Sequence, residues 1–429
     1  MTAEVAILNK SAVALAADSA ITVSYGRDVK VYNTLKLFSL SPCNSVGVMV
    51  YHNAEFTGVP WETIIKQYRS ERNQTFPTLE EYGTDFIDYL TNSRLLFPES
   101  QQDITTPRAV RSYLDLLAGT IDHSIRQYAR NGKIGLGKIK ELTRDFVNAW
   151  YLALQGEPQW SSLTPDIEQQ IITKYQGLFD TMITDVFQPL PLNQQIKRKL
   201  RSIAVWLLTK DLRSLRLPQG HSGIVIAGFG DNDIYPAITT FNVESLVLNQ
   251  LRYEHIGDKS DRITADMDAR VVAFAQEDVV TGFMEGLEPE LHHQTHHLLE
   301  RLLTSYAQEI VKKMPGLRGN RKKALLNAAT TLRANVLTDF HTRLHVLSQV
   351  LHVQPIVRAV AALPKEELAS MADALVSLTS TKRRVTMDLE TVGEPIDVAV
   401  ISRGDGFVWI KRKHYFQPEK NPQFFTKYR

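Results

Sequence analysis

The sequence has only one cysteine, Cys43, among its 429 residues. One thiol cannot form an intramolecular disulfide framework, so the class of small disulfide-stapled secreted proteins is excluded. The chain also lacks a surplus of charge of one sign, with 49 Lys and Arg against 47 Asp and Glu. Because nucleic-acid binding rests on a basic surplus, we expect no nucleic-acid partner.

Long apolar runs are missing as well. No uninterrupted apolar segment reaches the roughly 20 residues that span a bilayer, and no basic region followed by an apolar core stands at the start. We therefore expect no membrane partner and a cytoplasmic location. Hydrophobic residues make up 43% of the chain, which is enough to bury several cores. No internal repeat and no low-complexity tract interrupts it, and no cofactor is expected.

A hydroxyl amino acid, Thr2, follows the first methionine. A methionine before such a small residue is normally trimmed, which would leave a threonine with a hydroxyl and a free α-amine. An α-amine has a reference pKa near 8, so part of it is neutral at physiological pH and can accept the hydroxyl proton during attack on a carbonyl. Thr2 is therefore a candidate nucleophile that carries its own base.

The residues after Thr2 predict a scaffold for that chemistry. Two short apolar runs, 5–8 and 13–17, flank the polar turn 9–11 and predict a buried β-hairpin. Asp18 ends the second run, where the hairpin returns it towards Thr2, and Lys36 begins another apolar run. A lysine beside the terminal amine would lower the pKa of that amine, and Asp18 would hold the lysine in place.

Thr2, the hairpin, Asp18 and Lys36 together resemble the N-terminal threonine, aspartate and lysine of proteasome β-type subunits, which are N-terminal nucleophile (Ntn) hydrolases. Residues 45–56, 223–229 and 393–401 continue the resemblance, which covers about 180 of the 429 residues. It implies a divergent bacterial-type member with large helical insertions. It also implies a homo-oligomer, such as a ring, with a peptide or amide substrate and an ATPase or other protein as a further partner.

The sequence departs from that pattern at the supporting positions. The glycine whose amide forms the oxyanion hole in the family is replaced by Tyr51, His52 and Asn53, and a backbone N–H of any residue type can fill that role. The family's Gly-Ser-Gly segment is replaced by residues 274–278. The supporting acid near the end of the chain is either Asp388 or Glu390, and the sequence does not decide between them.

The arrangement of apolar patterns predicts an α+β fold. We expect a four-layer αββα sandwich of antiparallel sheets, the Ntn hydrolase fold, built from residues 2–74, 218–284 and 385–416. Residues 75–217 and 285–384 carry helix signals and are expected to be two helical insertions, and residues 417–429 a flexible tail. Thr78 with Glu81 predicts a capping box, and Thr106 with Pro107 predicts a helix start.

A histidine-rich segment offers a weaker site. His292 and His296 are four residues apart, as are His293 and His297, and such pairs can chelate a transition metal, with Glu300 as a third ligand. Histidine pairs on an exposed helix are more often solvated or partner-facing residues. The basic residues Arg318, Arg321, Lys322 and Lys323 most simply form a solvated face.

Two function classes follow from these patterns. The first is an N-terminal-threonine amide-bond hydrolase, a proteasome-like peptidase that works through an acyl-enzyme formed on Thr2. The second is a catalytically silent assembly or binding protein that uses the same fold for contacts with partners. A metal-dependent hydrolase centred on His292 and His296 is a distant third. Loss of the first methionine is required only by the first class.

Overall fold

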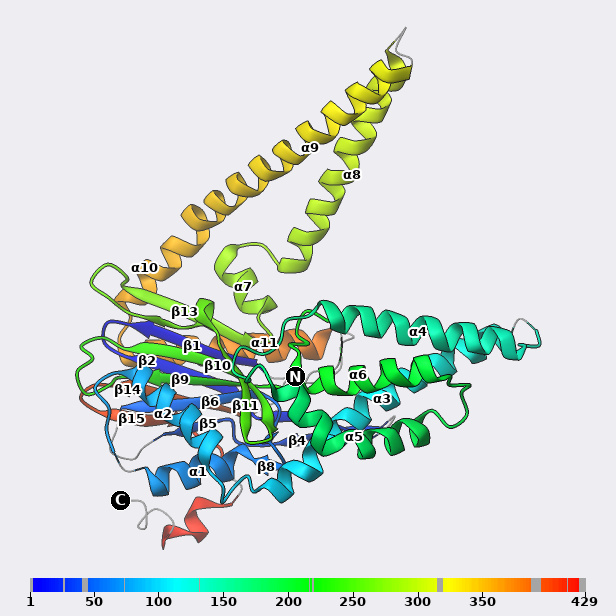
Figure 1. The fold of residues 1–429 in the computed structure, drawn as a ribbon. Coiled ribbons are helices and arrows are strands. Elements are labelled where there is room, and N and C mark those ends of the chain that lie inside the picture. The colour runs from blue at the N-terminus through cyan, green and yellow to red at the C-terminus, as the bar shows by residue number, and fades with distance from the viewer. Residues whose placement is uncertain are drawn as a thin grey trace.

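Antiparallel sheets and many helices are combined in the computed structural model of the chain (Figure 1). The predicted α+β class is therefore confirmed. No helix of the described residues is both long enough and apolar enough to cross a membrane. The described residues are 3–25, 28–40, 45–72, 74–130, 132–215, 217, 220–314, 319–386, 395–414 and 416–423.

Five antiparallel strands form the first sheet, in the order β13-β1-β2-β14-β15. The hairpin predicted at the start of the chain is confirmed by β1 (Ala3–Asn9) and β2 (Val13–Asp18). The other strands are β13 (Ala269–Ala275), β14 (Ile396–Ser402) and β15 (Gly406–Lys411). Because β14 pairs with β2, a segment from the last part of the chain lies beside one from the first.

The second sheet is also antiparallel, in the order β11-β10-β9-β6-β5, with β12 paired to β10. Its strands are β5 (Leu37–Ser39), β6 (Val46–His52), β9 (Ser222–Gly228), β10 (Ala237–Val247), β11 (Gln250–His255) and β12 (Asp261–Arg262). Two further strand pairs are β3 (Ala20–Tyr25) with β4 (Asp28–Asn33), and β7 (Glu55–Phe56) with β8 (Val59–Pro60).

The two sheets pack face to face. Alternate residues of β1 divide between two cores: Ala6 and Leu8 pack against the second sheet, whereas Val5 and Ile7 pack against helices. At Gly47 the sheets approach so closely that a Cβ atom would lie 2.8 Å from a methyl group of Ile401. Glycine is therefore required there by the close approach of the sheets.

Helices cover the outer face of each sheet. Apolar residues of α1 (Trp61–Glu71) and α2 (Leu79–Asn92) share a core with the second sheet. Apolar residues of α10 (Gln354–Ala362) and α11 (Lys365–Val385) share a core with the first sheet. The predicted division assigns α2 and α11 to the insertions, yet both contact the sheets directly. The division into domains stays a prediction.

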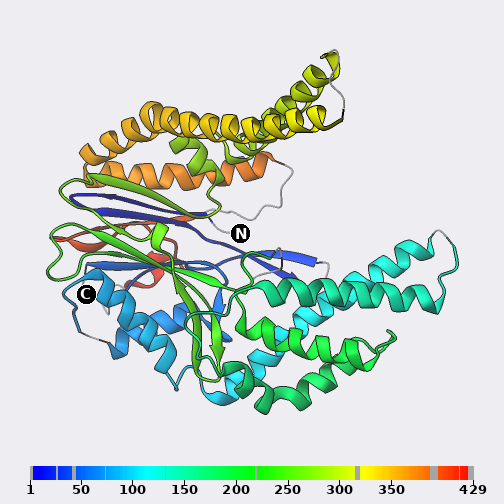
Figure 2. The ribbon, with the colours of Figure 1, turned by 45° about the horizontal axis from the view of Figure 1, so that its top comes forward.

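A group of four helices extends from one side of the sheets (Figures 1 and 2). They are α3 (Glu99–Ala129), α4 (Leu136–Gly156), α5 (Ile167–Val186) and α6 (Gln194–Thr209). These helices share a separate apolar core, which includes Leu117, Phe179 and Leu200. The helix start predicted at Thr106 is wrong, because Pro107 lies inside α3 and the buried side chains on both sides continue the helix.

The capping box predicted at Thr78 is also wrong. The Thr78 hydroxyl donates to Glu81 Oε1 at 3.0 Å and makes no cap hydrogen bond. The first backbone N–H of α2, at Leu79, instead donates to Asp233 Oδ2 at 2.9 Å, and the N–H of Gly230 donates to the same oxygen. A carboxylate from the β9–β10 connection therefore takes the place of the local cap.

The last prominent element is a pair of long helices that projects away from the first sheet (Figure 1). The short helix α7 (Asp278–Glu285) leads into α8 (Pro289–Lys313), and α9 (Gly319–Ser348) runs back antiparallel to it. A π-helical turn (Gln349–Val353) joins α9 to α10. Two short 3₁₀ turns, Gly257–Lys259 and Pro418–Lys420, complete the described elements.

Candidate active site

A buried ion pair lies at the beginning of β1. The Lys36 ammonium is 2.7 Å from Asp18 Oδ1, and the exposed fractions of the two side chains are 6% and 0%. The backbone N–H of Ala3 donates to the same carboxylate oxygen at 3.1 Å. Lys36 Nζ also donates to the carbonyl oxygen of Ala20. One carboxylate oxygen of Asp18 therefore links the lysine to the residue that follows Thr2.

Strand register brings these groups together. In the β1–β2 ladder Glu4 is paired with Ala17, so Asp18 is level with Ala3. Lys36 immediately precedes β5 in the second sheet, where its carbonyl oxygen accepts a hydrogen bond from the N–H of Val50 at 2.9 Å. The Lys36 side chain therefore connects the second sheet to the end of β2 in the first.

Three of the residues predicted for the site cannot be placed. Thr2, Asp388 and Glu390 lie outside the described residues. Among the three residues predicted to catalyse, Asp18 and Lys36 are in contact, while their catalytic role stays a prediction. His52 and Asn53 lie at the end of β6, and His52 lines the same small pocket as Lys36.

Two further carboxyl groups flank the ion pair. Ala17 is paired with Glu4 on one side and with Asp397 on the other. Residues paired across antiparallel strands share a face of the sheet, and Ala17 packs towards the second sheet. Glu4 and Asp397 therefore lie on the face between the sheets, where each is only 1% exposed.

These two carboxyl groups have perturbed proton affinities. Burial raises the pKa of Glu4 well above its usual value, the Lys36 ammonium opposes this shift and the Asp18 carboxylate adds to it. Neither carboxyl oxygen of Glu4 has a hydrogen-bond partner among the described residues. Burial also raises the pKa of Asp397, although the N–H of Lys413 donates to Asp397 Oδ1 at 2.7 Å. Such groups beside a specific charge pair are typical of functional sites.

The sequence interpretation missed Glu4 and Asp397. Each is an acidic residue inside an otherwise apolar strand, which is a readable signal because acidic side chains are rarely fully buried unless paired. The interpretation looked for the supporting acid at Asp388 or Glu390 instead. Among the described residues near the end of the chain, Asp397 of β14 is the acidic residue that lies beside β2.

Glu4 yields a stability prediction. Replacing Glu4 with Met keeps the side-chain length and removes a buried carboxyl without hydrogen-bond partners, so we expect the free energy of unfolding to rise by about 1–3 kcal/mol. Urea denaturation at pH 7 measures this change. Because the pKa of Glu4 is raised in the folded state, the wild-type protein should lose stability as the pH rises above 4.5, and Glu4→Gln should lack that loss. A destabilised Glu4→Met variant would contradict the expectation.

His52 adopts an unusual backbone conformation at the end of β6. Its φ angle is 70°, in the left-handed region that non-glycine residues seldom adopt and that often marks functional sites. Its ring contacts the His221 ring edge-on, with centroids 4.7 Å apart. The adjoining segment is fixed by Asn53, whose amide donates to the Gly220 carbonyl oxygen at 3.3 Å.

Both imidazoles are held in the neutral form. Desolvation by the surrounding protein, then the His221 ring, lower the pKa of His52 to about 4, although His52 is exposed at the end of β6. Burial, then the Arg213 guanidinium, lower the pKa of His221 to about 4. Arg213 is itself paired with Asp211.

A pH titration tests this assignment. Because both folded-state pKa values lie below 6.5, the neutral rings contribute stability that is fully present above pH 6.5 and is lost as the pH falls towards 4. In an NMR titration, the imidazole C–H resonances of His52 and His221 should shift with midpoints near 4. Midpoints close to 6.5 would show that the rings are not desolvated.

A small pocket adjoins Lys36. It has a volume of about 60 Å³ and is lined by Thr34, Lys36, His52, Asn53 and Trp61 among others. That volume lies far below the roughly 300–1,000 Å³ of sites for drug-sized ligands, so it suits one small side chain. Tyr51, the residue before His52, packs its ring over Gly223. A Cβ atom at Gly223 would lie 1.9 Å from a carbon atom of that ring.

The segment at residues 274–278, which replaces the Gly-Ser-Gly of the resemblance, takes part in a polar network. Gln276 Oε1 accepts a hydrogen bond from Arg383 Nε at 2.8 Å, and Arg383 is paired with Asp278 at 2.7 Å. Lys382 is paired with the same carboxylate at 3.0 Å. These contacts join the start of α7 to the last turn of α11.

The weak candidate metal site at His292 and His296 is not assembled among the described residues. His296 Nδ1 lies 2.5 Å from His341 Nε2 of α9, and His293 Nε2 lies 3.1 Å from His297 Nε2. The five imidazoles of residues 292, 293, 296, 297 and 341 form one chain of ring contacts. Among the described residues, however, no three or more His, Cys, Asp or Glu side chains are arranged to hold a metal ion.

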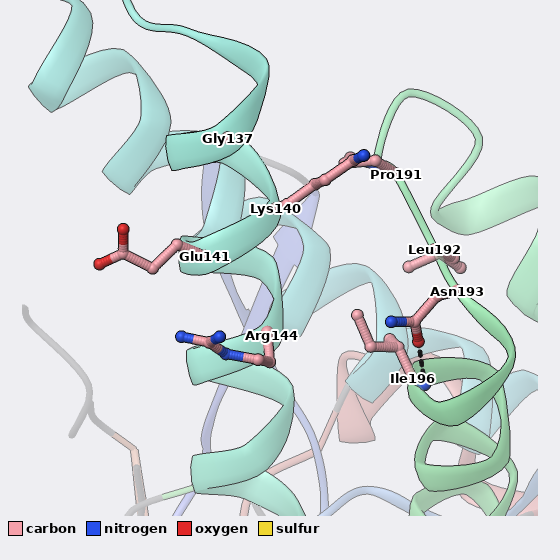
Figure 3. Close-up of a pocket in the computed structure, with 8 residues that line it drawn as sticks. All are labelled: Gly137, Lys140, Glu141, Arg144, Pro191, Leu192, Asn193 and Ile196. Atoms are coloured by element: carbon pink, nitrogen blue, oxygen red, sulfur yellow. Dashed lines mark hydrogen bonds between the residues drawn. The ribbon is translucent and has the colours of Figure 1, made fainter.

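A larger pocket lies away from these groups, in the helical part of the chain. It has a volume of about 570 Å³ and is lined by residues at the start of α4 and just before and within α6, including Lys140, Arg144 and Asn193 (Figure 3). Asn193 Oδ1 there accepts a hydrogen bond from the N–H of Ile196, which caps α6. The pocket contains none of the residues predicted for catalysis.

Comparison with known proteins gives matches among solved structures alone. No protein-family model matches the chain. No curated protein matches it either. The solved structures that match include Anbu complexes.

The first is described as "Helical Assembly of the Anbu Complex from Pseudomonas aeruginosa", with 9% identity, a TM-score of 0.31, and coverage of 99% of this chain and 93% of that one. An Anbu (Gly-1) mutant from Hyphomicrobium sp. strain MC1 has 11% identity and a TM-score of 0.27, with 100% and 97% covered. Anbu, the ancestral β-subunit, from Yersinia bercovieri has 11% identity and a TM-score of 0.27, with 99% and 91% covered.

These matches correct the family resemblance. The assignment to the proteasome β-subunit-like Ntn hydrolases is wrong, because the matched structures are Anbu complexes, a distinct family, and no family model recognises the chain. TM-scores of 0.27 to 0.31 are too low to establish a family or to carry an argument about activity. The function is therefore inferred from the side chains of this chain alone.

Proposed function

We propose that this chain is an amide-bond hydrolase that uses Thr2, once it is the first residue, as its nucleophile. The observation that supports this proposal is the buried Lys36–Asp18 pair and its hydrogen bond to the N–H of Ala3. A buried ion pair costs desolvation energy and is a poor stabiliser compared with apolar packing. Its presence at the beginning of β1 favours a chemical role.

In the proposed reaction, the Thr2 hydroxyl oxygen attacks the carbonyl carbon of the substrate amide, and the hydroxyl proton moves to the α-amine of Thr2. The C–N bond then breaks and the leaving amine takes that proton, which leaves an ester on Thr2. A water molecule attacks the ester, passes its proton to the threonine oxygen through the α-amine, and releases the acid product. The backbone N–H groups of His52 and Asn53 are the candidates for stabilising the oxyanion.

Lys36 and Asp18 take supporting roles in this reaction. The positive charge of Lys36 would disfavour protonation of a neighbouring α-amine, which keeps the amine available as a base. Asp18 holds Lys36 and the start of β1 through one oxygen atom. Burial raises the pKa of Glu4 well above its usual value, so Glu4 competes less well than Asp18 for the Lys36 ammonium.

The proposed substrate is a peptide or small amide with a small side chain beside the cleaved bond. The pocket of about 60 Å³ next to Lys36 supports this choice. His52, which lines this pocket, is neutral at physiological pH, and the Lys36 ammonium beside it disfavours a basic side chain.

We further propose that the two sheets and the helices on their outer faces form the four-layer αββα sandwich expected from the sequence. The cores between α1–α2 and the second sheet, between the sheets, and between the first sheet and α10–α11 support this description. In the division that we propose, α1, α2, α10 and α11 belong with the layers that they cover, and the helices α3–α6 and α8–α9 form the two insertions.

A catalytically silent assembly or binding protein is the second candidate. The exposed apolar residues of the α8–α9 helices favour contacts with a partner. The two candidates differ in the state of the N-terminus. The native protein should have the intact mass of a chain that begins at Thr2, and it should cleave a mixture of short peptides. An inactive protein, or an active one that retains Met1, would reject the hydrolase.

A further inference from the structure

The helices α8 and α9 project beyond the body of the molecule as a hairpin (Figures 1 and 2). Only Val311 on α8 and Leu337 on α9 are buried. Large apolar side chains are nevertheless frequent on its surface, and those used below are Leu291, Leu302, Tyr306, Leu332, Val336 and Val346, with exposed fractions of 54, 56, 68, 63, 39 and 53%. Apolar surface gathered on a projecting element indicates an interaction site.

Contacts between the two helices fix their register. His296 lies against His341, and Arg333 Nη1 donates to Thr304 Oγ1 at 2.8 Å. In both contacts the two residue numbers add up to the same value. The same register therefore places Leu302 level with about Val336, Tyr306 level with about Leu332, and Leu291 level with Val346. The apolar residues of the two helices thus follow one another along the hairpin in level pairs.

These pairs lie on one side of the hairpin. An α-helix turns by about 100° per residue, so residue numbers give directions around each helix axis. On α8 the exposed apolar residues are rotated by roughly 100° from the residues that face α9, and on α9 the rotation is similar and in the same sense. Because the two helices are antiparallel, rotations in the same sense bring both rows to the same face. We call this the hairpin face.

Charge is unevenly distributed along the hairpin. The tip carries Lys312, Lys313, Arg321, Lys322 and Lys323, all of them exposed. The other end carries the exposed residues Glu285 and Glu290, and also Glu288, which is already paired with Lys382 of α11. A second hairpin laid antiparallel on the first would set the basic tip of each against the acidic end of the other, and it would also match apolar pairs in the middle.

We propose that the hairpin face binds the hairpin face of a second copy of this chain, as an antiparallel, two-fold symmetric four-helix bundle. Each hairpin has a basic end and an acidic end. A two-fold axis sets the basic end of one copy against the acidic end of the other, so this charge distribution favours a second copy over an unrelated partner. The apolar pairs around Leu302 and Val336 lie at the centre of the contact. α8 has 25 residues and is therefore about 37 Å long, which gives room for several such pairs.

Charge reversal gives a test with a distinctive outcome. In variant A, Lys313→Glu and Lys322→Glu make the tip acidic, and in variant B, Glu285→Lys and Glu290→Lys make the other end basic. Each variant alone should repel its own copies, and light scattering at micromolar concentration should return half of the wild-type mass. An equimolar mixture of A and B should recover the wild-type mass, because each tip then meets an end of opposite charge.

The apolar centre is tested with a matched control. Leu302→Glu with Val336→Glu should halve the mass without changing the circular dichroism spectrum, whereas Leu95→Glu with Ile234→Glu should leave the mass unchanged, since those side chains are exposed elsewhere, at 75 and 72%. A monomeric wild-type chain, a mass unaffected by Leu302→Glu with Val336→Glu, or a mixture of A and B that stays dissociated would overturn the proposal. Hairpin-dependent binding of the wild-type monomer to anionic vesicles would replace it with a membrane contact.

Discussion

Thr2→Ala is expected to abolish amide hydrolysis while leaving the fold intact. The change removes the oxygen that forms the acyl-enzyme, so kcat/KM should fall by about 10³-fold or more, which corresponds to roughly 4 kcal/mol of transition-state stabilisation. The buried Lys36–Asp18 pair and the hydrogen bond from Ala3 do not depend on the Thr2 side chain, so the thermal unfolding midpoint should stay the same. Cleavage of a fluorogenic peptide amide measures the loss.

Thr2→Ser provides the control for this variant. Serine keeps both the hydroxyl and the α-amine, so measurable cleavage should remain. Full activity in Thr2→Ala would show that the nucleophile is another group, and the binding-protein alternative would gain if the wild-type protein had no activity to lose.

Lys36→Met is expected to reduce both activity and stability. The change removes a charge that assists proton transfer, and such assistance is worth about 10²- to 10⁴-fold in rate. It also leaves Asp18 buried without its lysine partner, and breaking a buried pair in this way costs about 3–5 kcal/mol. Peptide cleavage and urea denaturation measure the two effects separately.

Two comparisons separate the effects of Lys36→Met. Lys10→Met breaks an ion pair with Asp268 in which the side chains are 39 and 58% exposed, so it should change stability by no more than about 1 kcal/mol. Adding Asp18→Asn to Lys36→Met removes the stranded charge while keeping an acceptor for the N–H of Ala3. Stability should then recover in part and activity should not. Recovery of both would mean that Lys36 has a structural role only.

Local patterns predicted those parts of the fold that depend on neighbouring residues. The polar turn at residues 9–11 predicted the β1–β2 hairpin. The prediction held because the turn is stabilised locally, by hydrogen bonds from the N–H groups of Ser11 and Ala12 to Asn9 Oδ1. The start of α2 was not predictable in the same way, because its cap comes from Asp233, far along the chain. The helix start predicted at Pro107 was wrong for a related reason. Packing in the core of the four helices keeps α3 continuous across the proline.

The site was predictable to a similar degree. Asp18 ends one short apolar run and Lys36 begins another, and the contact between these two residues was expected from the sequence. Asp397 lies beside β2 only because β14 pairs with it, which is a contact between distant segments that no local pattern records. The His52–His221 contact likewise joins the end of β6 to the residue before β9. Glu4 could have been noticed from its place in an apolar strand.

The most direct test of the account is to locate a covalent bond to the nucleophile. The native protein is treated with a β-lactone, whose strained carbonyl acylates an activated hydroxyl, and is then digested and analysed by mass spectrometry. We expect one adduct, on the peptide that begins with Thr2, and a markedly slower reaction in Lys36→Met. The same adduct on a different residue, or no adduct on a Thr2 terminus shown to be free, would contradict the account.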